Sequence, residues 1–160
     1  MFNLKIHYHN RRRLSAEEEA QSGGAVYCAS LHDLLSSSDI VSINCPLNAE
    51  TTNLIGAAEF AAMKDGVFLV NTARGAILHE PSLIAALESG KVARAGLDVF
   101  CNEPHDVDPY FFTSDKVVVQ PHLGGLTDVA FRRAETECFE NIRAWFRTGK
   151  PNSPVIQLGR

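Results

Sequence analysis

Four side chains that bind anions or move protons follow, or end, successive apolar runs of the sequence. Arg74 follows one run in the segment VNTARG, and Asp98 ends the next run in GLDVFCNEP, where Glu103 comes just after it. His122 follows a third run in QPHLGG. A guanidinium can bind a carboxylate through two parallel hydrogen bonds, and an imidazole can act as a general acid or base near neutral pH. These are residue types that an enzyme acting on an anion would use.

The elements that must position these residues are predicted from the alternation of apolar runs with helical segments. Six runs are predicted strands: Leu4–His9, Ala25–Cys28, Ile40–Asn44, Val67–Asn71, Ala93–Val99 and Lys116–Gln120. The runs VFLV and VVV are continuous, which is typical of strands covered on both faces. Strands that alternate with helices favour a doubly wound α/β domain, a parallel sheet with helices on both faces.

Helix boundaries are predicted from capping residues. Ser15 with Glu18 has the spacing of a capping box, and Ser30 with Asp33 is expected to cap a second helix. A third helix is expected over Ala57–Lys64. Further signals lie in the second half of the chain: Pro81 in a first turn, Gly90 as a stop, and Thr127 or Asp128 as the cap of a last helix that runs to about Thr148.

Ligands of such sheets bind beyond the carboxyl ends of the strands, where Arg74, Glu103 and His122 are all expected. Each has an ordinary explanation when taken alone. The arginine could be solvated, the glutamate could face water before a proline, and the histidine could be held in a turn by backbone. Their placement after three successive strands favours one shared pocket.

Four segments carry a resemblance to a known family. VNTARGAI, GLDVFCNEP, QPHLGG and NCPLNAETTNLI are similar, in order and separation, to the signature segments of the D-isomer-specific 2-hydroxyacid dehydrogenases. The segment HNRRRL resembles the glyoxylate and hydroxypyruvate reductase branch. The resemblance implies a Rossmann-like NAD(P)-binding domain over residues 1–150 and a tail, 151–160, that leads back towards a substrate domain.

The resemblance also implies catalytic roles. Arg74 matches the arginine that grips the carboxylate and carbonyl of a 2-keto acid, and His122 matches the acid/base that protonates the carbonyl oxygen. Glu103 matches the carboxylate that pairs with this histidine and raises its pKa. Asp98 matches the residue beside the nicotinamide carboxamide.

Cofactor contacts are implied in three pairs: Cys45 and Pro46 on the adenine side, Thr72 and Ala73 at the nicotinamide ribose, and Gly124 and Gly125 near the ring. Glycine lets backbone approach a ligand closely. Cys45 and Pro46 would serve equally well as packing residues.

The segment after the first predicted strand bears on the choice between NAD and NADP. Asn10 stands where an acidic residue would bind the ribose 2′-hydroxyl of NAD, and Arg11 and Arg12 follow it. Arginines can pair with a 2′-phosphate. We therefore expect NADP to be preferred over NAD; the alternative is a solvated basic turn before an acidic helix.

The sequence contains no GxGxxG, the loop that holds the pyrophosphate in this fold. The resemblance begins at the family's second strand, so we expect the first strand and its glycine-rich loop to be missing. The absence would leave a gap in the sheet or force the neighbouring strands together, and it would uncover apolar surface and leave the fragment inactive. A truncated gene model, a split gene, a pseudogene product or a deliberate fragment would all give this sequence pattern.

Composition limits the partners. The 160 residues carry a net charge of −4, which gives no reason to expect nucleic acid or an anionic membrane as partner. No apolar run approaches the roughly 20 residues that span a bilayer. Four scattered cysteines favour free thiols in a reducing cytoplasm and no metal site. A small 2-keto or 2-hydroxy acid is the expected substrate and a homodimer the expected intact form. A nucleotide-binding corepressor or scaffold, or a non-functional remnant, remains the alternative.

Overall fold

The computed structural model describes residues 3–154. The chain divides into two compact units, one up to Pro121 and the other from His122 onwards. Residues 1–2 of the predicted domain 1–150, and residues 155–160 of the predicted tail, lie outside the described residues.

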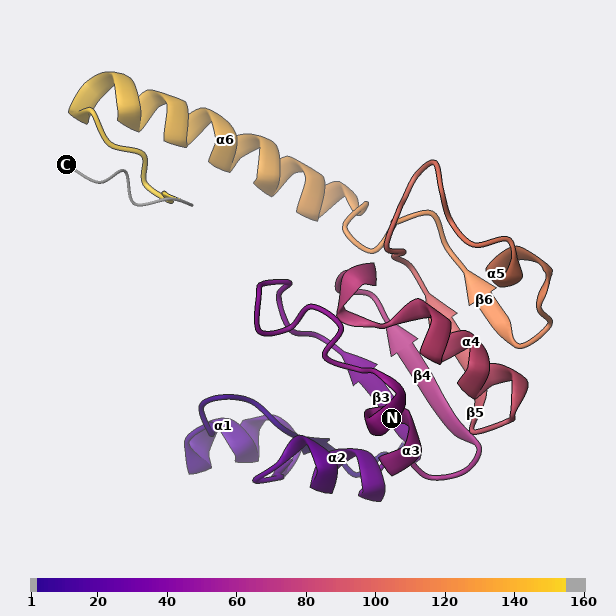
Figure 1. Ribbon diagram of the computed structural model, residues 1–160. Helices are drawn as coiled ribbons and strands as arrows, with labels where there is room; N and C mark the ends of the chain where they lie inside the picture. The colour runs from indigo at the N-terminus through magenta and orange to yellow at the C-terminus, as the bar shows by residue number, and fades with distance from the viewer. Residues whose placement is uncertain (1–2, 155–160) are drawn as a thin grey trace. The chain divides into compact units, whose positions relative to one another are not determined.

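The first unit holds a four-stranded parallel sheet and a separate pair of short parallel strands (Figure 1). The sheet has the order β3 (Ile40–Ile43), β4 (Val67–Asn71), β5 (Val92–Leu97) and β6 (Val117–Val119). The pair is β1 (His7–Tyr8) with β2 (Val26–Tyr27). All six predicted strands are present; β4 has the predicted bounds, and β1 and β2 are shorter than expected.

A break separates the two sheets. Within residues 3–154, no strand ladder joins β1 or β2 to β3. In a dinucleotide-binding fold the first strand lies between the second and the fourth, and β1 and β3 match those two positions. The break therefore falls where the absent strand would lie, which confirms the expected gap.

The helices begin at the predicted caps. Ser15 and Glu18 form the capping box of α1 (Ala16–Gln21), Ser30 caps α2 (Leu31–Ser37), and Thr127 caps α6 (Asp128–Thr148). The remaining helices are α3 (Ala57–Ala62), α4 (Glu80–Glu88), α5 (Tyr110–Thr113) and the 3-10 turn η1 (Gly75–Ile77). The sequence analysis did not predict α5 or η1.

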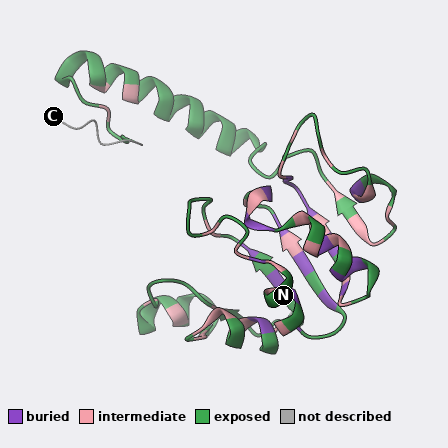
Figure 2. Ribbon diagram, in the orientation of Figure 1, coloured by how far each residue is buried: buried purple, intermediate pink, exposed green. Residues whose placement is uncertain are grey.

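The core of the first unit lies on one face of the four-stranded sheet. Val41, Leu69 and Leu97 point to this face and are almost fully buried. They join one apolar cluster with side chains of α2, α3 and α4 (Figure 2). In Figure 1 these helices lie along one side of the sheet.

The opposite face of this sheet, here called the open face, carries exposed apolar side chains. Ile40 on β3 is 50% exposed, Phe68 on β4 48% and Val118 on β6 69%. Alternate strand residues point to opposite faces, so these three share the face away from the core. The prediction that β4 and β6 are covered on both faces is wrong for Phe68 and Val118, whereas the expected uncovered apolar surface is confirmed.

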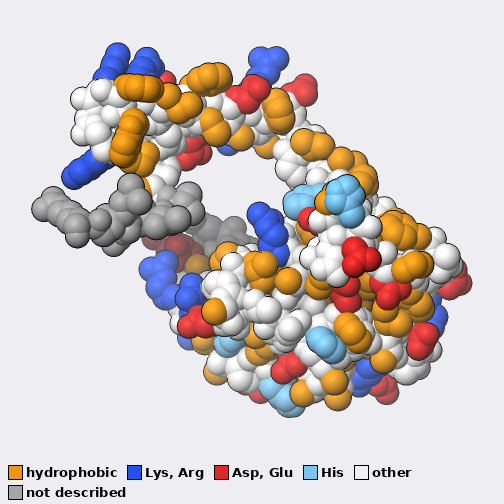
Figure 3. Space-filling view, turned by 45° about the horizontal axis from the view of Figure 1, so that its top comes forward, with side chains coloured by type: hydrophobic (Ala, Val, Ile, Leu, Met, Phe, Trp, Pro, Cys, Tyr) orange, Lys and Arg blue, Asp and Glu red, His pale blue; other side chains and the backbone are white. Residues whose placement is uncertain are grey.

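The second unit contains α6 and the segment that follows it. Gly149 ends the helix with a left-handed φ of 71°. Ser153 then bonds back to the helix, its backbone N–H to Asn141 Oδ1 and its hydroxyl to Glu137 Oε1, both at 2.8 Å. Apolar side chains of α6, including Phe139 and Phe146, are exposed and interspersed with charged ones (Figure 3).

Residues 3–154 contain no helix suited to cross a membrane and no side-chain cluster suited to hold a metal ion. Among the described helices, none combines the length and apolarity needed to cross a membrane. The same residues hold no cluster of three or more His, Cys, Asp or Glu side chains suited to a metal ion.

Candidate active site

The loop after β4 is shaped by a buried asparagine. Asn71 ends β4 and is fully buried. Its Oδ1 accepts the backbone N–H of Ala73, and its Nδ2 donates to the carbonyl of Arg74, each at 3.0 Å. These bonds fix the turn that carries Thr72, Ala73 and Arg74. The Arg74 side chain is exposed, and its Nη1 donates to the carbonyl of Ala73 at 2.6 Å.

Gly75 brings the loops after β4 and β5 into backbone contact. A Cβ placed on Gly75 would overlap the carbonyl group of Phe100 and the backbone nitrogen of Cys101. Only glycine permits so close an approach. The loop of Arg74 therefore packs directly on the loop that runs from Asp98 to Glu103.

The loop after β5 is held at several points. Asp98 is 5% exposed, and its backbone N–H donates to the carbonyl of Asn71 at 3.0 Å. Glu103 is partly buried, and its Oε2 accepts the N–H of Phe100 at 3.1 Å. Glu80 on α4 accepts the N–H of Cys101 at 2.8 Å. These contacts hold Asp98 and Glu103 beside the Arg74 loop.

Cys101 lies in the same loop but is poorly suited to act as a nucleophile. Burial, with a further contribution from the nearby Glu80 carboxylate, raises the pKa of its thiol to about 12. The thiolate is the reactive form of cysteine, and it is scarce here at neutral pH.

His122 begins the second unit. It has a φ of 57°, in the left-handed region that a non-glycine residue seldom adopts. Such conformations cluster at functional sites. His122, Gly124 and Gly125 are all exposed. Because they belong to the second unit, the expected meeting of His122 with Glu103 stays a prediction.

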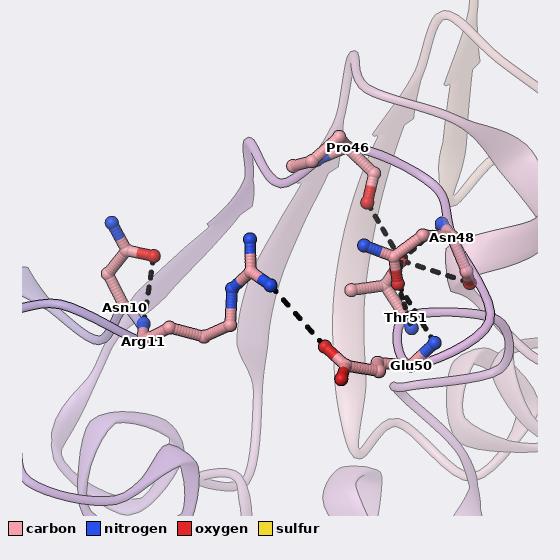
Figure 4. Close-up of polar contacts among 6 residues, drawn as sticks. All are labelled: Asn10, Arg11, Pro46, Asn48, Glu50 and Thr51. Carbon is pink, nitrogen blue, oxygen red and sulfur yellow. Dashed lines mark hydrogen bonds and ion pairs between the residues drawn. The ribbon is translucent and has the colours of Figure 1, made fainter. Parts of the chain in front are cut away.

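In the separate pair of strands, the segment after β1 is held by Tyr27 on β2. Its hydroxyl donates to the carbonyl of Asn10 at 3.4 Å, and Asn10 Oδ1 accepts the N–H of Arg11 at 2.9 Å. Arg11 Nη1 reaches Glu50 Oε2 at 3.5 Å (Figure 4). The Arg11 and Arg12 side chains are exposed.

Arg13 has a structural role that distinguishes it from Arg11 and Arg12. Its Nε and Nη2 donate to the two carboxylate oxygens of Glu19, at 2.8 and 3.1 Å, and its guanidinium lies 5.5 Å from the centre of the Tyr27 ring. Tyr8 donates to the same carboxylate at 2.7 Å. The hydrogen bonds from Arg13, which contribute most, and from Tyr8 lower the pKa of the Glu19 carboxyl group. This network ties the basic segment to α1 and leaves Arg11 and Arg12 exposed beside it.

The two residues predicted on the adenine side have different surroundings. Cys45 is partly buried and packs against the core, and its expected place on the adenine side stays a prediction. Pro46 is exposed, and its carbonyl accepts a hydrogen bond from Thr51 Oγ1 at 2.7 Å. The contact of Arg11 with Glu50 links the loops after β1 and β3, so Pro46 and Arg11 lie in neighbouring loops (Figure 4).

Sequence reasoning missed Asn71 and Gly75. One signal was available for Asn71, a polar residue at the end of a continuous apolar strand. Gly75 carries no comparable signal, because its importance depends on the place of Phe100, which lies 25 positions further along the chain.

A parallel sheet with cationic and carboxylate side chains in the loops at its carboxyl edge defines a Rossmann-like nucleotide-binding domain. Residues 1–124 match the family model described as "D-isomer specific 2-hydroxyacid dehydrogenase, NAD binding domain". The chain belongs to this family.

Similar proteins span more sequence than this chain. It is 62% identical over 160 residues to the dehydrogenase efuE of Hormonema carpetanum, with all of this chain and 40% of that protein aligned. A crystal structure of a glyoxylate reductase from Paecilomyes thermophila superimposes with a TM-score of 0.85 at 44% identity, over 94% of this chain and 44% of that one.

A second solved structure contains nucleotide. The NADPH-dependent glyoxylate/hydroxypyruvate reductase of Sinorhizobium meliloti, in complex with NADP and malonate, gives a TM-score of 0.86 at 30% identity. It aligns over 96% of this chain and 46% of its own. The chain thus spans less than half the length of each relative described here.

Proposed function

We propose that this chain is the cofactor-binding part of an NAD(P)-dependent oxidoreductase that acts on a small 2-keto or 2-hydroxy acid such as glyoxylate or hydroxypyruvate. The observation that carries the proposal is the backbone contact at Gly75, which holds the Arg74 loop against the Asp98–Glu103 loop. Family membership and the glyoxylate reductases among the similar proteins support the same function.

The residues divide the work at the nicotinamide end. Arg74 would bind the substrate carboxylate with its planar fork, a geometry that lysine lacks. His122 would give a proton to the carbonyl oxygen, and Glu103 would favour the charged imidazole. Asp98, Thr72 and Ala73, together with Gly124 and Gly125, would border the nicotinamide and its ribose. The bound dinucleotide would supply the hydride.

The surroundings of the basic segment support a preference for NADP over NAD. Asn10 places no carboxylate at its position, and Arg11 and Arg12 expose their guanidinium groups there. A 2′-phosphate would find two cations and no repulsion from residue 10. The NADP-bound reductase of Sinorhizobium meliloti is a structural relative, which agrees with this preference.

A chimera tests the catalytic proposal. The 160-residue chain is joined to those parts of the Hormonema carpetanum dehydrogenase that it does not span, and NADPH oxidation is followed with glyoxylate or hydroxypyruvate. We expect turnover by the chimera and none by the chain alone, which has no glycine-rich loop. His122→Ala in the chimera should lower kcat by about 10²- to 10⁴-fold.

Two outcomes would contradict the proposal. Absence of NADPH or NADH oxidation with every 2-keto acid would favour a nucleotide-binding scaffold or a remnant. Full activity after His122→Ala would remove the acid/base role assigned to that residue.

The remaining parts of the proposal concern assembly and location. We place the cofactor domain at residues 1–150, with 151–160 leading towards the substrate domain, and the intact protein as a homodimer without nucleic-acid or membrane partners. All four cysteines are free thiols, which suits a reducing cytoplasm. Sedimentation of the chimera tests the dimer.

A further inference from the structure

Glu50 makes the ion pair that links the loop after β3 to the predicted 2′-phosphate site. Its Oε2 lies 3.5 Å from Arg11 Nη1 (Figure 4). Arg11 comes from the loop after β1, 39 positions earlier in the sequence. The carboxylate thus meets the arginine that the proposed function assigns to the nucleotide.

The backbone that carries Glu50 is fixed by its own loop. Asn48 Oδ1 accepts the N–H groups of Glu50 and Thr51, at 2.8 and 3.1 Å. Thr51 Oγ1 in turn donates to the carbonyl of Pro46 at 2.7 Å and accepts the N–H of Asn48 at 2.8 Å. This closed turn presents the Glu50 carboxylate from a defined position rather than from a free loop, as Figure 4 shows.

The pair itself adds little to the stability of the fold. The Arg11 and Glu50 side chains are 79% and 74% exposed, and ion pairs at such positions are weak and screened by salt. The contact can therefore be exchanged at small cost for a stronger anion. A phosphate monoester has more charge than a carboxylate at neutral pH, and three oxygens that accept hydrogen bonds from a guanidinium.

We propose that Glu50 is a specificity-determining residue: its carboxylate competes with the nucleotide 2′-phosphate for the Arg11 guanidinium and so limits the preference for NADP over NAD. The inference rests on the proposed binding of the 2′-phosphate by Arg11. It assigns a role to a residue of the loop after β3 that lies outside the basic segment. Electrostatic repulsion between the carboxylate and the phosphate acts in the same direction as the competition.

The test measures binding of two small probes to the whole chain. Adenosine 2′,5′-bisphosphate carries the 2′-phosphate and 5′-AMP lacks it, and the two probes are otherwise alike, so the 2′-phosphate is their only difference. Titrations at low ionic strength are followed by NMR of the arginine Nε–H and backbone amide signals. We expect Glu50→Gln to strengthen binding of the bisphosphate by about two- to fivefold, the range that removal of one exposed charge interaction allows. Binding of 5′-AMP should change less than about twofold, and added salt should reduce the gain.

Two further variants separate competition from general charge effects. Glu88→Gln removes the same single negative charge from the last residue of α4. This end of α4 lies at the amino edge of the parallel sheet, so the substitution should leave the affinities for both probes unchanged. In an Arg11→Ala background, Glu50→Gln should yield a much smaller gain than in the native chain. Dispersed amide spectra establish that each variant is folded.

The outcomes distinguish this inference from the proposed function. If the native chain prefers the bisphosphate, and Arg11→Ala removes the preference but Glu50→Gln leaves it unchanged, the role of Glu50 is wrong and the NADP proposal stands. If the native chain prefers the bisphosphate and Glu50→Gln increases that preference, both are supported. If Glu50→Gln creates a preference that the native chain lacks, the role of Glu50 is supported and the NADP preference of the native chain is wrong. If no variant prefers the bisphosphate, or an equal gain appears with Glu88→Gln or without Arg11, the competition at Arg11 is refuted.

Discussion

Replacing Gly75 with alanine adds one methyl group at the point where the loop of Arg74 touches the loop that runs from Asp98 to Glu103. The new Cβ would collide with the carbonyl carbon and oxygen of Phe100 and with the nitrogen of Cys101. Non-bonded carbon atoms rest about 3.5–4.0 Å apart, so the loops would have to separate by more than about 1 Å. Gly75 lies outside the left-handed region of φ, and the effect is therefore steric rather than conformational.

The size of the effect follows from what the methyl group meets. Overpacking by a methylene-sized group costs about 1–3 kcal/mol, and the upper end applies because backbone cannot rotate away as a side chain can. With a urea m-value of about 1–3 kcal/mol/M, a loss of about 3 kcal/mol lowers the unfolding midpoint by about 1–3 M. In the chimera the same displacement should cost about 100-fold in kcat/KM, because Arg74 and Glu103 no longer hold their relative positions.

The matched control is Gly96→Ala on β5. A Cβ at Gly96 meets no atom within 4 Å, and its φ is also outside the left-handed region. The substitution should change the free energy of unfolding by less than about 1 kcal/mol, with a gain possible because alanine loses less backbone entropy on folding. Urea unfolding followed by circular dichroism measures both variants. Equal midpoints for the two would refute the close contact inferred at Gly75.

Three other predictions concern buried or bonded polar groups. Asn71→Ala should lower the free energy of unfolding by about 1–3 kcal/mol, because two buried hydrogen bonds are lost, whereas the exposed Asn44→Ala should change it by less than about 0.5 kcal/mol in the same urea titration. With its pKa of about 12, the Cys101 thiol should react with iodoacetamide at about pH 8 roughly a thousandfold more slowly than the exposed thiol of Cys138; mass spectrometry of peptides gives the two rates, and similar rates would contradict the burial of Cys101. Because the pKa of Glu19 is lowered by folding, its contribution to stability is present above the unfolded pKa of about 4.5 and is lost as pH falls through the folded value; the difference in urea midpoint between the native chain and Glu19→Gln should therefore shrink between about pH 6 and about pH 3, and a constant difference would exclude the linkage.

Local signals in the sequence predicted most elements. Ser15 and Thr127 identify helix starts because the side-chain oxygen of each accepts the backbone N–H of the residue three positions later. This hydrogen bond joins residues that are close in the sequence, so the sequence alone reveals it. The four apolar residues of β4, followed by Asn71, likewise predict the strand without tertiary information. The short helix α5 was missed because four residues carry too little periodicity to be recognised.

The site was predictable in its residue types and less so in its supports. Arg74 and Glu103 could be placed on adjoining loops because parallel strands end at one edge of a sheet. The ion pair of Arg13 with Glu19 and the approach of Gly75 to Phe100 depend on how separate segments meet. The exposure of Phe68 could not be predicted from the continuous apolar run. Such a run indicates that both faces of the strand are suited to burial, but it does not show whether another element packs on each face.

Because the two sheets are separate, the loops that follow the four-stranded sheet and the loop that follows β1 are held in place by different interactions. The loops of Arg74 and Glu103 extend from a four-stranded ladder, whereas β1 and β2 form a two-residue pairing of a kind that is marginal in isolation. The loop with Asn10 and Arg11 therefore depends on the contacts among Tyr8, Arg13 and Glu19 for its shape. Local unfolding of residues 3–28 would therefore release the loop with Asn10 and Arg11 while the four-stranded sheet stays folded.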